Sequence, residues 1–123
     1  MPHLYHNNLI HSFLENVTCF YSILGFLPQE YRTHKEIGLK NCLRGEIDII
    51  LYFNGLERAL IEAKSKRPPG KIQENNLEKQ MRFYSSYNPN AELFLLFGSE
   101  DNSLNPKEFT LERYISTSRD PSH

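Results

Sequence analysis

The middle of the sequence alternates between apolar runs and single charged residues in a way that predicts two strands joined by a tight turn. Residues 47–53 and 59–63 are the two apolar runs, and Asn54-Gly55 lies between them as a turn signal. Successive residues of a strand point to opposite faces, so Glu62 and Lys64 share one face of the second strand. The other face carries small and branched apolar residues, which suit a core. Charged residues therefore interrupt strands that are otherwise built to be buried.

The residues before this hairpin predict a helix followed by an outer strand. Apolar residues recur at spacings of three and four across residues 8–24, which is typical of one buried helical stripe, and Gly25 is a natural stop. Residues 30–40 alternate without a clean apolar face, which favours an edge strand. A loop at residues 41–44 then leads into the hairpin.

The residues after the hairpin predict a crossover helix, a buried strand and one last element. Residues 72–87 form the helix, which Asn88-Pro89 ends, and residues 91–98 are a continuous apolar run typical of a strand covered on both faces. Strand, helix and strand would then form a right-handed crossover with parallel strands. The last element is either a helix capped by Asn105 or a strand over residues 109–116.

Length and composition favour one soluble domain. The chain has 123 residues, of which 39% are hydrophobic and 24% are charged, and its formal net charge is −1. We expect a single domain over residues 1–115 and a disordered tail over residues 116–123, which have nothing to bury. No apolar run approaches the length of a membrane span and the N-terminus lacks the pattern of a signal peptide, so we expect a cytoplasmic protein without a membrane partner. Cys19 and Cys42 form no metal or redox motif and are expected to be buried free thiols.

Asp48 and Glu62 are the candidate chemical groups of the two central strands. Two carboxylates about 4 Å apart repel by roughly 4 kcal/mol at an effective dielectric constant of 20. A hard divalent cation turns that repulsion into a binding site, and it can polarise a phosphate and lower the pKa of a bound water. The ammonium group of Lys64 can orient that water or stabilise developing negative charge. The alternative is that Glu62 and Lys64 are an ordinary ion pair on a half-exposed strand.

The metal hypothesis makes a geometric prediction about the hairpin. Residues directly opposite one another in an antiparallel pair point the same way. A regular two-residue turn at Asn54-Gly55 would put Asp48 and Glu62 on opposite faces of the pair. A shared metal site therefore requires either a loop with an odd number of residues or a β-bulge.

The pattern Ile47-Asp48 followed by Glu62-Ala63-Lys64 resembles the core motif of the PD-(D/E)xK nuclease superfamily, with Ile47 in the place of the family's proline. Gln80 and Tyr84 in the following helix resemble the Gln-x-x-x-Tyr of its RecB-type and type I restriction branch. Arg44-Gly45-x-x-Asp48 is similar to the archaeal Holliday-junction resolvases. The resemblance implies an α/β fold with a restriction-endonuclease-like αβββαβ core, in which helices flank a mixed central sheet. The plainer alternative for Tyr84 is a core residue with Gln80 at its edge.

Carried over to this chain, the resemblance implies a metal-dependent hydrolysis of DNA phosphodiester bonds. Asp48 and Glu62 would bind Mg²⁺ or Mn²⁺ together with the carbonyl group of Ala63. Lys64 would position or activate the attacking water. The supporting residues would be Gln80, Glu15 as the one acidic residue of the first helix, and Glu46 as a reserve ligand.

The same resemblance implies that the partner is DNA. Residues 31–71 contain nine Lys or Arg and five Asp or Glu, and this local excess of positive charge could meet phosphates. The candidate nucleic-acid contacts are Arg44, Lys66, Arg67, Lys71 and Tyr84. One chain carries one site, so cutting both strands requires a homodimer or a larger symmetric assembly.

Three alternatives stay open at this point. Within the nuclease class, the same core serves structure-selective cleavage of junctions and restriction-like cleavage of duplexes. A second class is a non-catalytic DNA-binding or scaffold module that keeps the nuclease fold. A third is an unrelated α/β domain, in which Asp48 and Glu62 would point apart.

Overall fold

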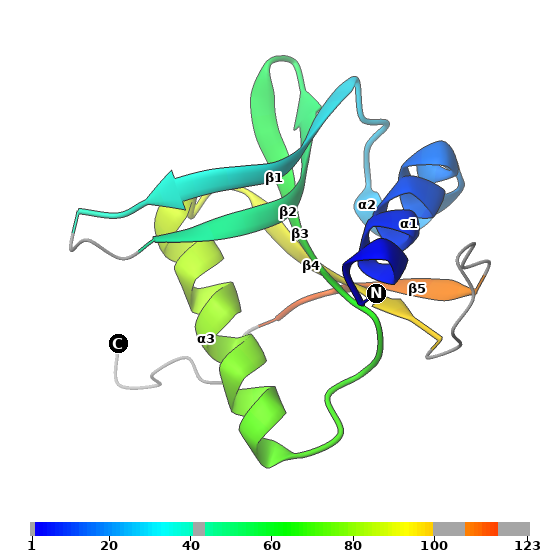
Figure 1. Ribbon diagram of the computed structural model, residues 1–123. Helices are drawn as coiled ribbons and strands as arrows, with labels where there is room; N and C mark the ends of the chain where they lie inside the picture. Colours follow the sequence, from blue (N-terminus) through cyan, green and yellow to red (C-terminus); the bar gives the residue numbers. More distant parts are fainter. Residues whose placement is uncertain (1, 41–43, 100–107, 116–123) are drawn as a thin grey trace.

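The computed structural model describes residues 2–40, 44–99 and 108–115, which are built around a five-stranded sheet (Figure 1). The strands lie side by side in their sequence order, β1 (Glu30–Gly38), β2 (Arg44–Phe53), β3 (Leu56–Lys64), β4 (Glu92–Gly98) and β5 (Phe109–Arg113). The helices are α1 (Pro2–Glu15), the 3₁₀ helix η1 (Val17–Phe20), α2 (Tyr21–Leu24) and α3 (Lys71–Tyr87). β3 and β4 run parallel and the other neighbouring pairs are antiparallel. The prediction of an α/β fold with a mixed sheet flanked by helices is confirmed.

Helices cover both faces of the sheet, and each face has its own apolar cluster (Figure 1). On one face, Phe13 of α1 belongs to the same cluster as Ile61 of β3. On the other face, Met81 of α3 belongs to the same cluster as Leu60 of β3. β3 is therefore buried on both sides, and a charged residue near its end lies beside apolar packing.

The β2–β3 hairpin has the bulge that a shared carboxylate site requires. Asn54-Gly55 forms a two-residue turn with positive φ angles of 54° and 78°, which suit an Asn-Gly pair. The register then shifts between Leu51 and Tyr52, because one extra residue of β3 bulges out. With the shifted register, Asp48 comes opposite Glu62. The geometric prediction made from the sequence is confirmed in its β-bulge form.

The sheet forks at the position of these two carboxylates. The pairing of β2 with β3 extends to Ile49 and Ile61, whereas the β1–β2 and β3–β4 pairs continue for several residues beyond that point. Ala63 lies beyond the fork, where β2 has turned away with β1. Side chains, rather than the backbone of β2, therefore meet the N–H and C=O groups of Ala63.

The predicted helix over residues 8–24 is wrong in its bounds. α1 covers Pro2–Glu15, and η1 and α2 follow it as separate short helices. The break falls at Asn16, whose side-chain amide donates a 2.8 Å hydrogen bond to a carbonyl group one turn earlier. Beyond the break, the ring of Phe20 stacks 5.8 Å from that of Phe109 on β5. That partner is far away in the sequence, so periodicity alone could not reveal the change of direction.

Two smaller predictions about this region have different outcomes. Gly25 ends α2 with a φ angle of 83°, and its N–H donates to the carbonyl group of Tyr21, so the predicted stop is confirmed. Cys19 is exposed, and the prediction of a buried thiol is wrong for this residue, because η1 buries none of its residues. Cys42 lies outside the described residues.

The last described element is a strand, and the helix alternative for it is wrong. β5 pairs antiparallel with β4, buries Leu111 and exposes Thr110, which is the alternation expected of a strand at a sheet edge. Asn105 and residues 116–123 lie outside the described residues. The edge strand β1, the helix α3 and the parallel β3–β4 crossover are confirmed. Among the described residues, each helix is too short or too polar to span a lipid bilayer.

Gly98, the last residue of β4, allows the chain that leaves β3 to pass close by. A Cβ atom at this position would lie 2.7 Å from the Ser65 carbonyl oxygen and 2.8 Å from the Tyr5 hydroxyl. Because that carbonyl belongs to the backbone, relief would require the end of β3 to move. We expect Gly98→Ala to lower the free energy of unfolding by about 1–3 kcal/mol, measured by urea denaturation.

Gly70→Ala is the matched control for this prediction. At Gly70 the nearest atom to an added Cβ is 3.3 Å away and belongs to the flexible end of a side chain. Equal unfolding midpoints for the two variants would contradict the close approach at Gly98.

Candidate metal centre

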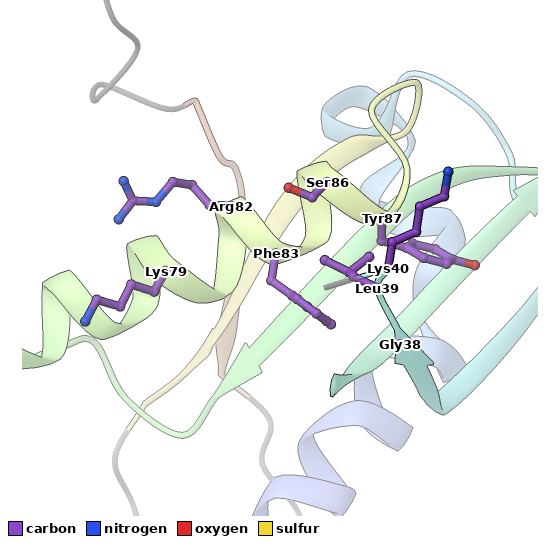
Figure 2. Close-up of a pocket in the computed structure, with 8 residues that line it drawn as sticks. All are labelled: Gly38, Leu39, Lys40, Lys79, Arg82, Phe83, Ser86 and Tyr87. Atoms are coloured by element: carbon purple, nitrogen blue, oxygen red, sulfur yellow. The ribbon is translucent and has the colours of Figure 1, made fainter. Parts of the chain in front are cut away.

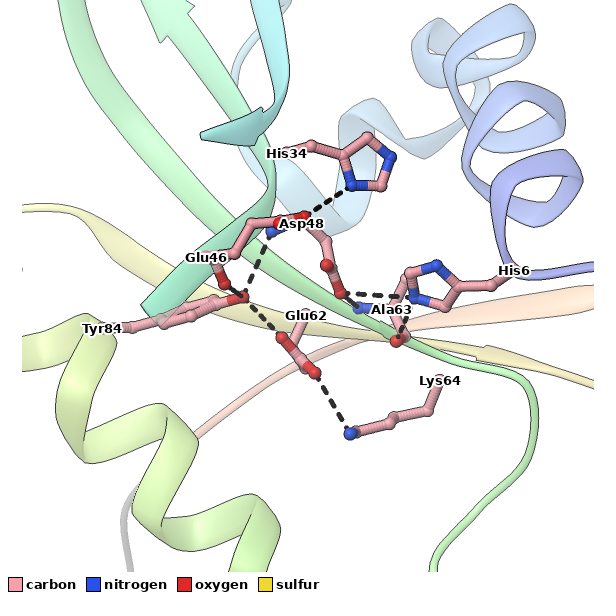
Figure 3. Close-up of polar contacts among 8 residues, drawn as sticks. All are labelled: His6, His34, Glu46, Asp48, Glu62, Ala63, Lys64 and Tyr84. Atoms are coloured by element: carbon pink, nitrogen blue, oxygen red, sulfur yellow. Dashed lines mark hydrogen bonds and ion pairs between the residues drawn. The ribbon is translucent and has the colours of Figure 1, made fainter. Parts of the chain in front are cut away.

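Asp48 lies in the fork between β2 and β3, with only 8% of the residue exposed. Its Oδ2 accepts a 2.8 Å hydrogen bond from the backbone N–H of Ala63 (Figure 3). The carboxylate therefore occupies the place that the backbone of β2 would take in an unbroken ladder. This contact fixes a negative charge against the end of β3.

Glu62 faces Asp48 from β3 and is 4% exposed. Its Oε1 accepts a 2.5 Å hydrogen bond from the Tyr84 hydroxyl of α3, and its Oε2 lies 3.2 Å from the Lys64 Nζ. Burial, and next the charge of Asp48, raise the pKa of Glu62 to about 7. Tyr84 and Lys64 thus compensate only part of the negative charge in the fork. A divalent cation would stabilise both ionised carboxylates, so the donor set fits a hard metal ion.

His6 is the site residue that the sequence did not predict. It projects from α1, and its Nε2 lies 2.9 Å from the Ala63 carbonyl oxygen and 3.5 Å from the Asp48 Oδ2 (Figure 3). The hydrogen bond to Asp48 raises the pKa of His6, against the opposing effect of burial. His6 precedes the buried residues Leu9 and Phe13 by three and seven positions. This spacing was the available signal, but a helix predicted to begin at residue 8 left His6 out.

A second group of ligand-type side chains lies on the outer side of Asp48. His34 of β1 places its Nδ1 2.8 Å from the Glu46 Oε1, and both residues are exposed. The ligand atoms of His34, Glu46 and Asp48 all lie within 4.8 Å of one another. Glu46, predicted as a reserve ligand, therefore lies beside Asp48. The backbone of His34, the third member of this group, has a left-handed φ angle of 53°. Asp48 is shared between a buried group and an exposed one.

The Gln80–Tyr84 pair contributes to the site through the tyrosine. Tyr84 is 1% exposed, so its prediction as a nucleic-acid contact is wrong, because the ring has no surface to offer DNA. Burial, and next the charge of Glu62, raise the pKa of Tyr84 above its usual value, which keeps its hydroxyl a hydrogen-bond donor. Gln80 is exposed one turn earlier and lines a cavity of about 280 Å³ together with Lys64. Gln80 is thus next to the site without holding either carboxylate.

The structure does not bring Glu15 into the site. Glu15 is the exposed last residue of α1, nine positions after His6. Nine residues advance a helix by roughly 13 Å and two and a half turns, which puts the two side chains on opposite sides of α1. Glu15 is therefore not at the fork where the sequence predicted it, and the side chain of α1 that reaches the fork is His6.

The predicted basic contacts lie on the segments that adjoin the site: Lys66 and Arg67 line the same cavity as Lys64, and Arg44 lines another one with Glu46. Arg44, Lys66 and Lys71 are exposed and form no ion pair with any residue in the described ranges. Arg67 pairs with Glu112 and lies 4.5 Å above the Phe97 ring, so part of its charge is already compensated.

Comparisons with known proteins do not add to this geometry. No protein-family model, curated protein or solved structure matches the chain. The arrangement of the residues themselves is therefore the basis for inferring a function.

Proposed function

We propose that the protein is a divalent-metal-dependent DNA endonuclease with a restriction-endonuclease-like core. One observation carries the proposal: the buried carboxylates of Asp48 and Glu62 lie on opposite sides of the fork, near enough for the charge of Asp48 to raise the pKa of Glu62, and Lys64 pairs with Glu62. Two buried negative charges in one place are unfavourable unless a cation is supplied. Mg²⁺ or Mn²⁺, which prefer oxygen ligands, fit this set.

The order of the elements supports the same proposal. α1 is followed by the three antiparallel strands β1, β2 and β3, then by α3 and the parallel strand β4. This succession agrees with the αβββαβ order that the PD-(D/E)xK resemblance implies. The site also lies at the strand positions that carry the motif.

Each residue of the fork has a distinct role in the proposal. Asp48, Glu62 and the Ala63 carbonyl would hold the ion, and His6, whose Nε2 contacts both the Ala63 carbonyl and Asp48, would orient these two ligands. When bound, the ion would polarise the scissile phosphate and lower the pKa of a water. Lys64 would orient that water and stabilise the charge that develops on the phosphate. Tyr84 keeps the Glu62 carboxylate turned toward the fork.

The substrate and the assembly follow from the surroundings of the site. Arg44, Lys66 and Lys71 carry exposed positive charges that would meet phosphates without reading bases. This supports DNA as the substrate and favours recognition of its shape, as in junction cleavage, over recognition of a base sequence. A homodimer would be required for cutting both strands, because each chain holds one such fork.

Lys64→Ala tests the proposal. We expect its single-turnover cleavage of plasmid and four-way-junction DNA in Mg²⁺ or Mn²⁺ to be about 10²- to 10³-fold slower than that of the wild type. Binding of Mn²⁺ should persist, because Lys64 is not among the proposed ligands. Arg32→Ala, which removes an exposed charge of β1 outside the fork, should cleave at the wild-type rate.

Equal inactivity of the wild type and Lys64→Ala on every substrate and metal would contradict the nuclease proposal. If DNA still bound under those conditions, the protein would be a non-catalytic DNA-binding or scaffold module.

A further inference from the structure

A second surface, between the end of β1 and α3, gathers positive charges that the proposed metal site does not use (Figure 2). It is a groove of about 700 Å³. Its lining includes Leu39, Lys40, Lys79, Arg82, Phe83 and Ser86. Lys79 and Arg82 project from the outer side of α3, and Lys40 approaches from the end of β1 (Figure 2).

The three cations of this groove have no acidic partner among the described residues, as is also true of Arg44, Lys66 and Lys71. Lys40, Lys79 and Arg82 form no ion pair with a described residue, and no acidic side chain of the described ranges lines the groove. Lys35 and Arg113, in contrast, are each paired with a glutamate. An unpaired group of like charges fits a polyanionic partner.

The floor of the groove is apolar and fixed in place. Phe83 packs so closely over Gly45 that a Cβ there would lie 2.6 Å from the Phe83 ring. This contact holds the start of β2 against α3, and Leu39 extends the apolar floor beside it. Cationic walls above an apolar floor suit a sugar–phosphate chain, whose phosphates are charged and whose sugars are not.

Two elements, β2 and α3, run from the groove to the metal site. Gly45 precedes Asp48 by three residues of β2, which is roughly 10 Å of extended strand. On α3, Phe83 of the groove is next to Tyr84 of the site. A distance of roughly 10 Å equals about three base pairs of duplex rise at 3.4 Å each.

We propose that this groove binds the phosphate backbone of a DNA strand about three nucleotides away from the fork. The identity of the polyanion rests on the proposed nuclease function, whereas the binding itself does not require cleavage. Lys40, Lys79 and Arg82 contact successive phosphates, and Phe83 supports the sugars between them. The groove thereby sets which part of a strand reaches Asp48.

Binding measured without metal tests the groove separately from the chemistry. A labelled four-way junction and a matched linear duplex are titrated in EDTA at salt concentrations from about 50 to 200 mM, where phosphate contacts dominate the salt dependence. Arg82→Gln and Lys79→Gln should each bind severalfold more weakly at the higher salt than the wild type does. Each should also reduce the slope of log K against log salt by about 0.9 per lost contact. Arg32→Gln, with the same change in charge on β1, should keep the wild-type slope.

The possible results separate the groove from the nuclease. If Arg82→Gln and Arg32→Gln give equal slopes, or the wild type binds no DNA at low salt, the groove proposal is overturned. It is also overturned if the wild type binds vesicles of anionic lipid instead and Arg82→Gln removes that binding. If Asp48→Asn cuts DNA as fast as the wild type, the proposed nuclease site is wrong. The salt slopes would still show whether the groove binds DNA.

Discussion

Asp48→Asn is expected to remove DNA cleavage while leaving the fold intact. The substituted amide keeps an oxygen that can accept the Ala63 N–H, so the contact that closes the fork survives. The negative charge needed to hold a divalent ion is lost. We expect single-turnover cleavage to fall by at least about 10³-fold, more than for loss of one uncharged donor. Plasmid nicking in Mg²⁺ measures this directly.

The melting temperature gives a second test of Asp48 as a metal ligand. A ligand at a hundred times its dissociation constant stabilises the native state by about 2.7 kcal/mol. Wild-type protein should therefore melt at a higher temperature with Mn²⁺, and Asp48→Asn should lose most of that increase. A variant that retained both the Mn²⁺ effect and the cleavage rate would exclude Asp48 as a metal ligand.

Asp48→Asn should also change how the stability of the metal-free protein depends on pH. The pKa of Glu62 is raised from 4.5 to about 7 by burial and by the charge of Asp48. The folded state then binds more protons than the unfolded chain, so wild-type stability falls as the pH rises between these values. Asp48→Asn removes one of the two causes, so its decline should be shallower in EDTA. An unchanged decline would show that burial alone raises the pKa of Glu62.

The sequence predicted the centre of the fold well, because local pattern decides it. The alternation around Glu62 predicts two strands, and the requirement that Asp48 share its face predicts either an odd-numbered loop or a β-bulge, of which the structure has the bulge. The helix α3 and the parallel strand β4 follow from periodicity and an apolar run. In each case the residues that decide the element are neighbours in the chain.

The failures share a different physical origin. The break at Asn16 depends on Phe20 reaching β5, and the place of His6 depends on a carbonyl group 57 residues away. Periodicity describes one face of one helix and carries no information about such distant partners. Glu15 is the one acidic residue of α1, but composition does not tell which side of the helix faces the fork, and Glu15 lies on the side opposite His6. Tyr84 satisfied a motif, but its burial follows from packing against the whole sheet.

Tyr84→Phe is expected to weaken both metal binding and folding, although the tyrosine is not itself a ligand. Its hydroxyl donates to the Glu62 carboxylate at 2.5 Å and accepts the Asp48 backbone N–H at 3.3 Å, so it touches both strands of the fork. Without it, two buried groups lose a partner, which costs about 1–3 kcal/mol. Partners that orient metal ligands typically contribute 10- to 100-fold in affinity. We therefore expect the dissociation constant for Mn²⁺, measured by calorimetry, to be 10- to 100-fold larger.

Tyr87→Phe, at the end of the same helix, is the control that separates orientation from general destabilisation. The Tyr87 hydroxyl donates to the Glu57 carboxylate at 2.7 Å, so the substitution removes the same kind of hydrogen bond away from the fork. If the two variants bound Mn²⁺ equally well, Tyr84 would serve packing alone. If only Tyr84→Phe loses affinity, Tyr84 both packs α3 against the sheet and orients the metal ligands. The stability of the fold and the binding of the metal would then depend on the same side chain.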